Sequence, residues 1–457
     1  MEVLRHRLQD VFADGLRHHQ AGRLDEAVAC YRRVLALRAD LPEVHFNLGV
    51  ALARQGQPDD AAACYRRALE LKPDYVAAWS NLGNVLRAQG RLDEAVACYR
   101  RVLDHAPNVP HIHYNLGNAL KAQGQLDEAV ACYRTAIALD PDSVEAHTNL
   151  SLALLARGDL AAGWQEYEWR WNGPLIKDRR DFAQPQWRGE AAEGRTLLIH
   201  AEQGFGDTLQ FCRFAPLAAA RGLRVIMEMQ PPLLRLLRGL EGVDRVVGRG
   251  EPLPPFDLHC PMLSLPLALG TTIATIPAAA SYLRADETQV AAWRARLAAM
   301  TGQGPRIGLV WAGKSYSYLP PMAAVDRRRS LAPERLAPLL GLPGLRFFSL
   351  QSGGQAPPVG FPLTDVMTEM TDFADTAALI ANLDLVVSVD TSVAHLAAAL
   401  GKPVWVLNRF DSCWRWFADR RDSPWYPTLR LYRQPRPGDW DAVIAAVVRD
   451  LRRLAGA

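Results

Sequence analysis

The sequence lacks long hydrophobic runs and a clear surplus of either charge. No stretch of it approaches the roughly 18 apolar residues of a membrane span, and charged residues occupy the start, where a signal peptide has its apolar core. We therefore expect a cytoplasmic protein with no membrane span. The 52 Lys and Arg exceed the 49 Asp and Glu by only three charges. So small a surplus argues against nucleic acid as a partner.

The sequence is also poor in cysteine. It has seven, an odd number with no close pairing of the kind that binds metals. Reduced thiols that serve as small core residues are expected. The chain has 457 residues, of which 49% are hydrophobic and 22% charged, which excludes disorder and predicts about three domains' worth of structure.

An internal repeat organises the first third of the chain. The first four cysteines lie 34 residues apart, and glycine, alanine, tyrosine, proline and the triplet Asn-Leu-Gly recur at the same interval. Each unit has two helical apolar stripes joined through a glycine. We place units at about 8–41, 42–75, 76–109 and 110–143, with a degenerate, capping fifth unit from 144. Its aromatic end, at 163–171, is expected to pack on the domain that follows.

Asparagines recur along the repeats and are expected to form a ladder on the concave face. An asparagine amide can donate to and accept from a peptide backbone, so these side chains are candidates for binding an acceptor protein. A structural role at tight helix contacts is an equally good interpretation. The candidates are Asn47, Asn81, Asn84, Asn115 and Asn118, with Asn149 continuing the series.

After a linker the pattern changes to short apolar runs that alternate with helical stretches, which is typical of an α/β fold. Expected strands of a first lobe are 196–201, 224–229, 245–247 and 256–260. A helix near 287–300 leads to a second set at 306–311, 346–351, 385–389, 404–408 and 428–432. Two such sheets would bind ligands at their carboxyl edges. The expected domains are 1–175 for the repeats, 176–194 for the linker, and 195–303 and 304–457 for the two lobes.

The first chemical motif, at 202–208, follows the first expected strand and precedes a helix expected to begin near Thr208. Gly204 and Gly206 allow backbone amides to approach a ligand, although the motif is no dinucleotide fingerprint, because Leu209 replaces the third glycine. Asp207 has two interpretations: a helix N-cap, or a base that takes a proton from an acceptor hydroxyl.

The second motif lies at 390–395, between the strand at 385–389 and a helix. Asp390, Thr391 and Ser392 bring polar side chains and free amides to the start of this helix, an arrangement that suits a phosphate. His395, about one turn further on, is placed to donate to the same anion. A helix cap with a satisfied core histidine is the alternative.

The third motif, at 308–315, matches the letters of a phosphate-binding P-loop, but its spacing residues form an expected strand. We expect no helix to begin at 316–321, so the P-loop interpretation is rejected. Lys314 can still contact a phosphate as a point charge. The charged run 326–330, which includes Arg329, is either a site for a diphosphate or an acidic sugar, or a solvated loop.

Two features are expected to be structural. Asp439 and Asp441 form the one Asp-x-Asp pattern, which opens the last expected helix and suits capping better than metal binding. The second feature is a set of four aromatic residues, for which core packing is a better interpretation than stacking on a base or sugar: Trp414, Trp416, Trp425 and Tyr426.

The first third resembles the tetratricopeptide repeat, and its asparagine ladder is similar to that of the O-linked N-acetylglucosamine transferases. The lobes resemble glycosyltransferases of GT-B architecture, specifically the heptosyltransferase-like group, and the overall plan is shared with flagellin glycosyltransferases. The resemblance implies two Rossmann-like lobes, Asp207 as the catalytic base and a nucleotide-sugar site in the second lobe. This sequence has Ser392 where the family has glycine. Donor-binding residues are then expected to be Gly204, Gly206, Lys314, Arg329, Gln351, Asp390, Thr391, Ser392 and His395.

The expected function is transfer of a sugar from a nucleotide-sugar to an acceptor, with inversion and with no metal or other cofactor. The acceptor is expected to be a protein hydroxyl docked by the repeats. Two alternatives stay open: a repeat adaptor whose transferase domain has lost turnover, and an enzyme that acts on a glycan or lipid.

Overall fold

The computed structural model describes residues 2–173, 179–300, 302–313, 320–353, 360 and 362–456. The chain divides into two compact units, Met1–Leu154 and Leu155–Ala457. The division falls inside one helix, so the last part of the fifth repeat belongs to the second unit. Each unit is described by itself below.

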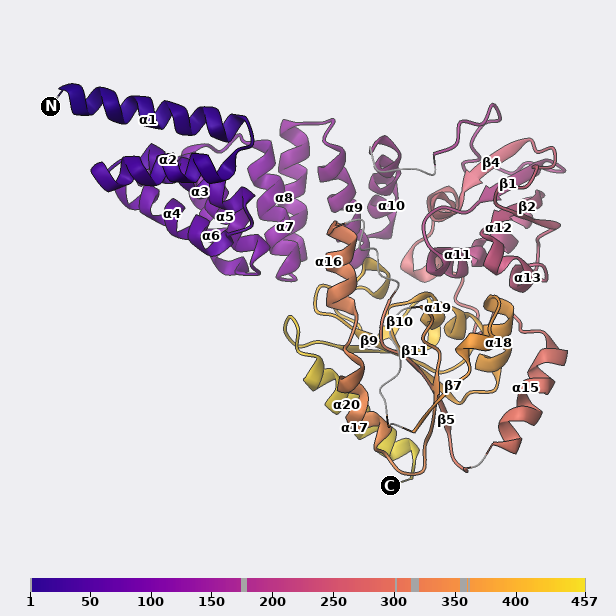
Figure 1. Cartoon of the computed structure of the whole chain (residues 1–457). Coiled ribbons are helices and arrows are strands. Elements are labelled where there is room, and N and C mark those ends of the chain that lie inside the picture. Colours follow the sequence, from indigo (N-terminus) through magenta and orange to yellow (C-terminus); the bar gives the residue numbers. More distant parts are fainter. Residues whose placement is uncertain are drawn as a thin grey trace. The chain divides into compact units, whose positions relative to one another are not determined.

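The first unit is a series of paired helices (Figure 1). The helices of the repeats, including the two that reach into or lie in the second unit, are α1 (Glu2–Gln20), α2 (Leu24–Leu37), α3 (Pro42–Arg54), α4 (Pro58–Leu71), α5 (Val76–Ala88), α6 (Leu92–His105), α7 (Pro110–Ala122), α8 (Leu126–Leu139), α9 (Val144–Arg157) and α10 (Leu160–Tyr167). Proline begins three of them, where its missing N–H costs no helical hydrogen bond.

Two glycine positions in each repeat explain the close packing of its helices. A glycine at φ of 75–82°, a conformation that suits glycine, makes the turn inside each of the first four pairs. The other glycine lies against the ring of the repeat tyrosine, so that a Cβ at Gly49, Gly83 or Gly117 would come within 2.7 Å of a ring carbon. The small residues at these positions therefore allow the helices to approach closely, and the buried tyrosines fill the space between the helices.

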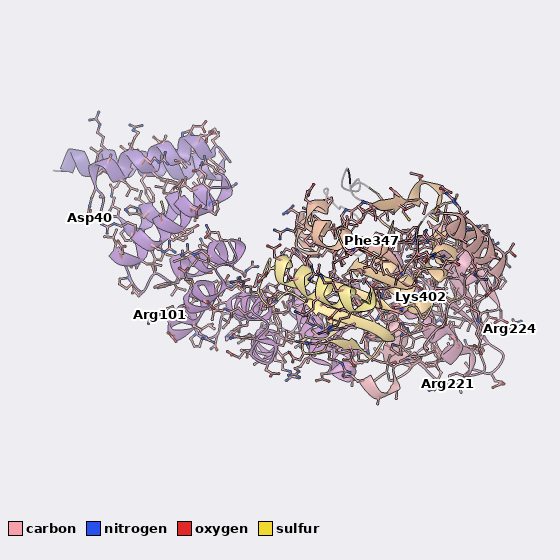
Figure 2. The ribbon with its side chains drawn as sticks, turned by 90° about the horizontal axis from the view of Figure 1, so that it is seen from below. Asp40, Arg101, Arg221, Arg224, Phe347 and Lys402 are labelled. Atoms are coloured by element: carbon pink, nitrogen blue, oxygen red, sulfur yellow. The ribbon has the colours of Figure 1, made fainter. Side chains whose placement is uncertain are left out.

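The second unit holds two parallel sheets, which confirms the α/β prediction of two lobes. The first has the order β3-β2-β1-β4 and all its neighbours are parallel. The second has the order β10-β11-β9-β8-β5-β6-β7 and is parallel except for the edge pair β10–β11. The hydrophobic core of this lobe includes Phe347 of β6, which is labelled in Figure 2. The strands are β1 (Thr196–His200), β2 (Arg224–Met229), β3 (Arg245–Gly248), β4 (Leu258–Pro261), β5 (Arg306–Val310), β6 (Arg346–Ser349), β7 (Leu363–Asp365), β8 (Leu385–Val389), β9 (Val404–Asn408), β10 (Asp422–Ser423) and β11 (Tyr426–Arg433).

Helices connect these strands. Those of the first lobe are α11 (Phe205–Phe211), α12 (Ala215–Ala219), α13 (Leu234–Leu237) and α14 (Leu265–Ala268), and α15 (Glu287–Ala299) follows them. Those of the second lobe are α16 (Pro320–Arg329), α17 (Ala337–Leu340), α18 (Phe373–Ala381), α19 (Ser392–Ala399) and α20 (Trp440–Leu454). Among the short 3-10 segments, η1 (Glu168–Asn172), η4 (Met262–Ser264) and η8 (Trp414–Trp416) matter below.

The structure corrects four expectations. α11 begins at Phe205 rather than near Thr208. A helix does begin inside 316–321, because proline is accepted in the first turn of α16, and the charged run 326–330 lies largely in this helix rather than in a loop. The first repeat helix begins at Glu2 rather than near residue 8. The edge strands β7 and β10 were not expected, since each has too few residues to show an alternating pattern.

Candidate functional site

The first predicted motif forms the turn between β1 and α11. Gly204 is the N-cap of α11, and Asp207 is the third residue of the helix, where its Oδ2 accepts from the Gly204 amide at 2.9 Å. The predicted capping role is thus present, but from inside the first turn. Gln203 adopts φ of 61°, a conformation that side chains other than glycine rarely take. The turn is held in a strained, defined shape at the carboxyl edge of the first sheet.

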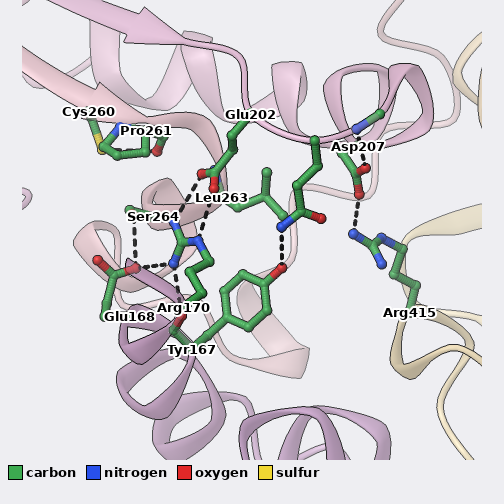
Figure 3. Close-up of polar contacts among 12 residues, drawn as sticks. Tyr167, Glu168, Arg170, Glu202, Asp207, Cys260, Pro261, Leu263, Ser264 and Arg415 are labelled. Atoms are coloured by element: carbon green, nitrogen blue, oxygen red, sulfur yellow. Dashed lines mark hydrogen bonds and ion pairs between the residues drawn. The ribbon is translucent and has the colours of Figure 1, made fainter. Parts of the chain in front are cut away.

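Asp207 has a second partner, which sequence reasoning missed. Its Oδ1 accepts from Nη2 of Arg415, which lies in η8 of the other lobe (Figure 3). The guanidinium also lies 4.3 Å from the centre of the Trp414 ring and donates to Sγ of Cys413 at 3.3 Å. Burial opposes the charge of Arg415, but the Asp207 carboxylate outweighs it and raises the pKa of Arg415 above its ordinary value. The predicted base is therefore ion-paired to a permanent cation.

The second motif lies beside this pair. Thr391 is the N-cap of α19, and its Oγ1 is 3.0 Å from Oγ of Ser388 at the end of β8. A Cβ added to Gly206 would lie 3.0 Å from Cδ2 of His395 and 3.6 Å from Cα of Ser392. The structure thus brings the starts of α11 and α19, one from each lobe, into contact.

His395 is a core histidine. It is 4% exposed and stacks on Trp416 with ring centres 5.2 Å apart. Its Nδ1 is 2.8 Å from the Tyr426 hydroxyl, and its Nε2 is 3.9 Å from Asp390. Burial, and then the charge of Arg415, lowers the pKa of His395 to about 3. The ring is neutral at physiological pH, so it would contribute a hydrogen bond rather than a charge to a bound anion.

Other predicted donor residues lie at the same edge of the second sheet. Arg329 donates to the carbonyl of Asp390 at 3.3 Å and pairs with Asp326, and its guanidinium lies where a Cβ on Gly313 would be. The side-chain amide of Gln351 hydrogen-bonds to the backbone. Its Oε1 accepts from the amides of Trp311 and Ala312, and its Nε2 donates to two backbone carbonyls. This geometry gives Gln351 a structural role. Lys314 lies outside the described residues.

A cavity of about 310 Å³ opens on this lobe near the end of α16. Arg327, Arg328 and Arg335 line it, together with Asp411 and Trp440. Arg328 pairs with Asp411 at 3.1 Å and Arg335 pairs with Asp441, so the lining is basic but partly neutralised. Of the arginines in the charged run 326–330, Arg327 and Arg328 therefore line this cavity, while Arg329 faces Asp390.

A buried cluster fixes the loop before Asp207 to the end of the fifth repeat (Figure 3). Arg170, in η1, binds both carboxylate oxygens of Glu202 at 2.9 Å and donates to Ser264 at 2.8 Å. The Tyr167 hydroxyl accepts from Gln203 at 2.9 Å. This confirms that the aromatic end of the repeats packs on the following lobe. Sequence signals for the pairing were absent, because the partners are 32–94 residues apart.

The predicted asparagines of the repeats hydrogen-bond within the first compact unit, either inside one repeat or between neighbouring repeats. Asn84 accepts from the Tyr99 hydroxyl at 2.8 Å and from Asn115 at 3.2 Å, and Asn118 accepts from Tyr133 at 2.8 Å. Asn81 bonds to the Tyr65 hydroxyl, and Asn47 donates to the carbonyl of Glu43 in its own helix. These contacts establish a structural role. Binding of an acceptor stays a prediction.

The residues expected to be structural are so. Asp439 caps α20 by accepting from the Ala442 amide, and the predicted aromatic group is at most 5% exposed. The seven cysteines are free thiols. Within the described ranges, no three His, Cys, Asp or Glu side chains are grouped so as to hold a metal, and no helix is long and apolar enough to cross a membrane.

Comparison with protein families agrees with this two-part architecture. Residues 46–110 and 98–131 match models described as tetratricopeptide repeat, and residues 15–56 and 117–158 match a model described as TPR repeat. Residues 360–408, which include β8, the start of α19 and β9, match the model of glycosyltransferase family 9 (heptosyltransferase). The chain thus combines tetratricopeptide repeats with an α/β region of which residues 360–408 are similar to this glycosyltransferase family.

A particular relative is Protein FlbA of Caulobacter vibrioides, which is 28% identical over 326 residues. The match covers 65% of this chain and 53% of FlbA, so the chain spans about half the length of that relative. Among solved structures, MamA from Desulfovibrio magneticus RS-1 is 22% identical over 38% of this chain and 97% of its own, with a TM-score of 0.36. YrrB, titled a TPR protein with an unusual peptide-binding site, is 17% identical over 35% of this chain and 84% of its own, with a TM-score of 0.34.

Proposed function

We propose that the protein is a glycosyltransferase that moves a sugar from a nucleotide-sugar to a hydroxyl of a protein acceptor. One observation carries the proposal: the loop with Asp207 and the start of α19 meet, although they follow strands of different sheets. The second of these segments lies in the part that matches glycosyltransferase family 9. A carboxylate beside an anion-binding helix start is what transfer from a nucleoside diphosphate requires.

In this mechanism the first amides of α19 and Thr391 hold the donor diphosphate, and the dipole of the helix favours its charge. Arg329, which lies beside Asp390, adds a guanidinium at the same edge. Asp207 takes the proton of the acceptor hydroxyl as its oxygen attacks the anomeric carbon, and the bond to the diphosphate breaks on the opposite face. A single displacement of this kind inverts the anomeric centre. Positive groups at the helix start stabilise the departing phosphate.

The repeats are proposed to supply the acceptor. Helices α5 and α7 carry no acidic residue in the first turn and end with Arg87 and Lys121, whereas the second helix of each full repeat begins with two acids. The polar ends of the first helices of the middle repeats are therefore mildly basic, and the half-buried asparagines of these helices are placed to bind peptide groups.

The test is binding of nucleotides to the full chain, measured by calorimetry with a panel of nucleoside diphosphates and CMP. We expect one nucleotide to bind at micromolar concentration. Thr391→Ala should weaken it at least about tenfold, the worth of one hydrogen bond to a charged group. Thr135→Ala, on an exposed part of α8, is the matched control and should bind as wild type does. Failure of every nucleotide to bind would favour the adaptor alternative.

A further inference from the structure

The ion pair between Asp207 and Arg415 places a constraint on the proposed base. Both carboxylate oxygens are engaged, one by Arg415 and one by the Gly204 amide. The two side chains are 17% and 11% exposed, so water screens the pair only weakly. An acceptor hydroxyl therefore meets carboxylate oxygens that already face a donor. Close approach of the hydroxyl to Oδ1, as general base catalysis needs, requires that Arg415 be drawn away.

Arg415 is suited to exchange one anion for another. Among the described residues Asp207 is its one carboxylate partner, and Arg415 also contacts the Trp414 ring and the Cys413 sulfur. Neither of these contacts fixes the charge by a second ion pair. A planar guanidinium binds phosphate oxygens in the same forked geometry as a carboxylate, and a diphosphate carries more negative charge than one carboxylate.

The position of Arg415 also fits such an exchange. Gly206, next to Asp207, touches the first turn of α19 at Ser392 and His395. The charge of Arg415 acts on His395 in that same turn. The guanidinium thus lies close to the helix start at which the donor diphosphate is proposed to bind.

We propose that Arg415 is shared between two anions: it pairs with Asp207 in the free protein and with the diphosphate of the donor in the complex. Donor binding then releases the carboxylate, so the base becomes available only when a donor is in place and the donor binds before the acceptor. The inference rests on the proposed function and adds Arg415 to the residues that bind the donor.

The experiment measures binding of the nucleoside diphosphate identified above, and of inorganic pyrophosphate, to four full-length proteins: wild type, Asp207→Asn, Arg415→Gln and the double variant. Asparagine keeps an oxygen for the Gly204 amide but removes the charge. We expect Asp207→Asn to bind about 5–150-fold more tightly than wild type, the usual range of coupling between two sites. Arg415→Gln should bind more weakly, and the double variant should show no gain over Arg415→Gln.

Two controls keep the result interpretable. Arg420→Gln removes an exposed arginine of the neighbouring segment that pairs with Asp422, and it should bind as wild type does. Arg415→Lys keeps the charge and should retain part of the gain when combined with Asp207→Asn. Arg415→Met, which also removes the charge, replaces Arg415→Gln if that variant does not show a wild-type unfolding transition.

The possible failures are distinct. A gain that survives in the double variant would show simple repulsion between Asp207 and the ligand, and would overturn the shared role of Arg415. Binding of the nucleotide with no gain in Asp207→Asn would overturn it as well. If wild type binds neither nucleotide nor pyrophosphate, the proposed function fails together with the inference.

Discussion

At the scale of single residues, the tightest packing in the repeats is between a glycine and a tyrosine ring. Gly83 in α5 lies against Tyr99 in α6, which is fully buried, and the same pair recurs in the neighbouring repeats. The ring cannot move aside without disturbing the contact between the two helices, because the interior is close-packed.

Gly83→Ala is expected to lower the free energy of unfolding by about 1–2 kcal/mol. The new Cβ would lie 2.7 Å from the Tyr99 ring, and this overpacking outweighs the roughly 1 kcal/mol by which alanine favours a helix over glycine. Urea unfolding followed by circular dichroism measures the change. Gly239→Ala, where a Cβ would meet nothing within 4 Å, is the control and should stay within about 0.5 kcal/mol of wild type. A Gly83→Ala protein with the same free energy of unfolding as wild type would contradict the packing argument.

His200 is a second residue whose burial affects the stability of the protein. It ends β1, is 2% exposed, and neither ring nitrogen has a hydrogen-bond partner among the described residues. Burial, and then the charge of neighbouring His259, lowers the pKa of His200 to about 3. The folded protein holds this ring neutral, whereas the unfolded chain protonates it below its ordinary pKa of 6.5.

We predict that His200→Leu reduces the loss of stability in acid. A lowered pKa in the folded state contributes stability above pH 6.5 that is lost as the pH falls toward 3. At pH 4.5 the loss from this one group amounts to about 2–3 kcal/mol, at 1.36 kcal/mol for each pKa unit. Urea unfolding at several pH values should give a flatter curve for the variant. An unchanged slope between pH 6 and pH 4 would count against this prediction.

At the scale of elements, the buried cluster around Arg170 determines how η1 joins the first sheet. Glu202 follows β1 and is 3% exposed, and it also accepts from the Leu263 amide at the start of η4. Burial raises the pKa of Glu202 despite the charge of Arg170. Each member of the cluster therefore depends on the others to offset its loss of water.

Removing one partner of the Arg170–Glu202 pair should lower the free energy of unfolding more than removing both partners does. Arg170→Met leaves Glu202 buried without its cation and should destabilise the protein by about 3–5 kcal/mol, whereas Arg170→Met combined with Glu202→Leu should cost less than the sum of the single changes. Thermal and urea unfolding of the full chain measure both. Arg179→Gln, which breaks an exposed pair with Asp181, is the control and should change little. Additive effects would show that the pair is not coupled.

At the scale of the whole molecule, the first unit is expected to bind the acceptor and the second unit to bind the donor. The second unit contains both sheets, the candidate site and the last helix of the repeats. The first unit contributes none of the predicted donor residues. The expected domain limits at 175, 194 and 303 stay predictions.

Deletion of 1–143 tests this division, because it removes the four full repeats and leaves α9 intact. We expect the shortened protein to bind the nucleotide as wild type does and to transfer sugar to a small glycan, but to lose modification of a protein acceptor. Calorimetry and a transfer assay with a labelled donor measure the two properties. Retained modification of the protein acceptor would exclude a docking role for the repeats.

Much of the fold was predictable because its signals are local. The 34-residue interval identified the paired helices, and β2, β8 and β9 have the predicted bounds, since a buried strand is a short apolar run whatever surrounds it. The turn before Asp207 and the start of α19 could be assigned to carboxyl edges, because strand order along the chain places them there. The sequence by itself thus determined the repeat helices and most of the strands, whereas α16, β7 and β10 were not predicted.

Only the tertiary structure decided which of those residues meet. Arg415 lies 208 residues from Asp207 and in no motif, so no spacing could pair them. The burial of His395 and the use of Gln351 by backbone amides likewise depend on segments that are distant in the sequence. Charge and burial act through space, whereas a sequence pattern reports neighbours along the chain, and this is why the elements could be predicted while the electrostatics of the site could not.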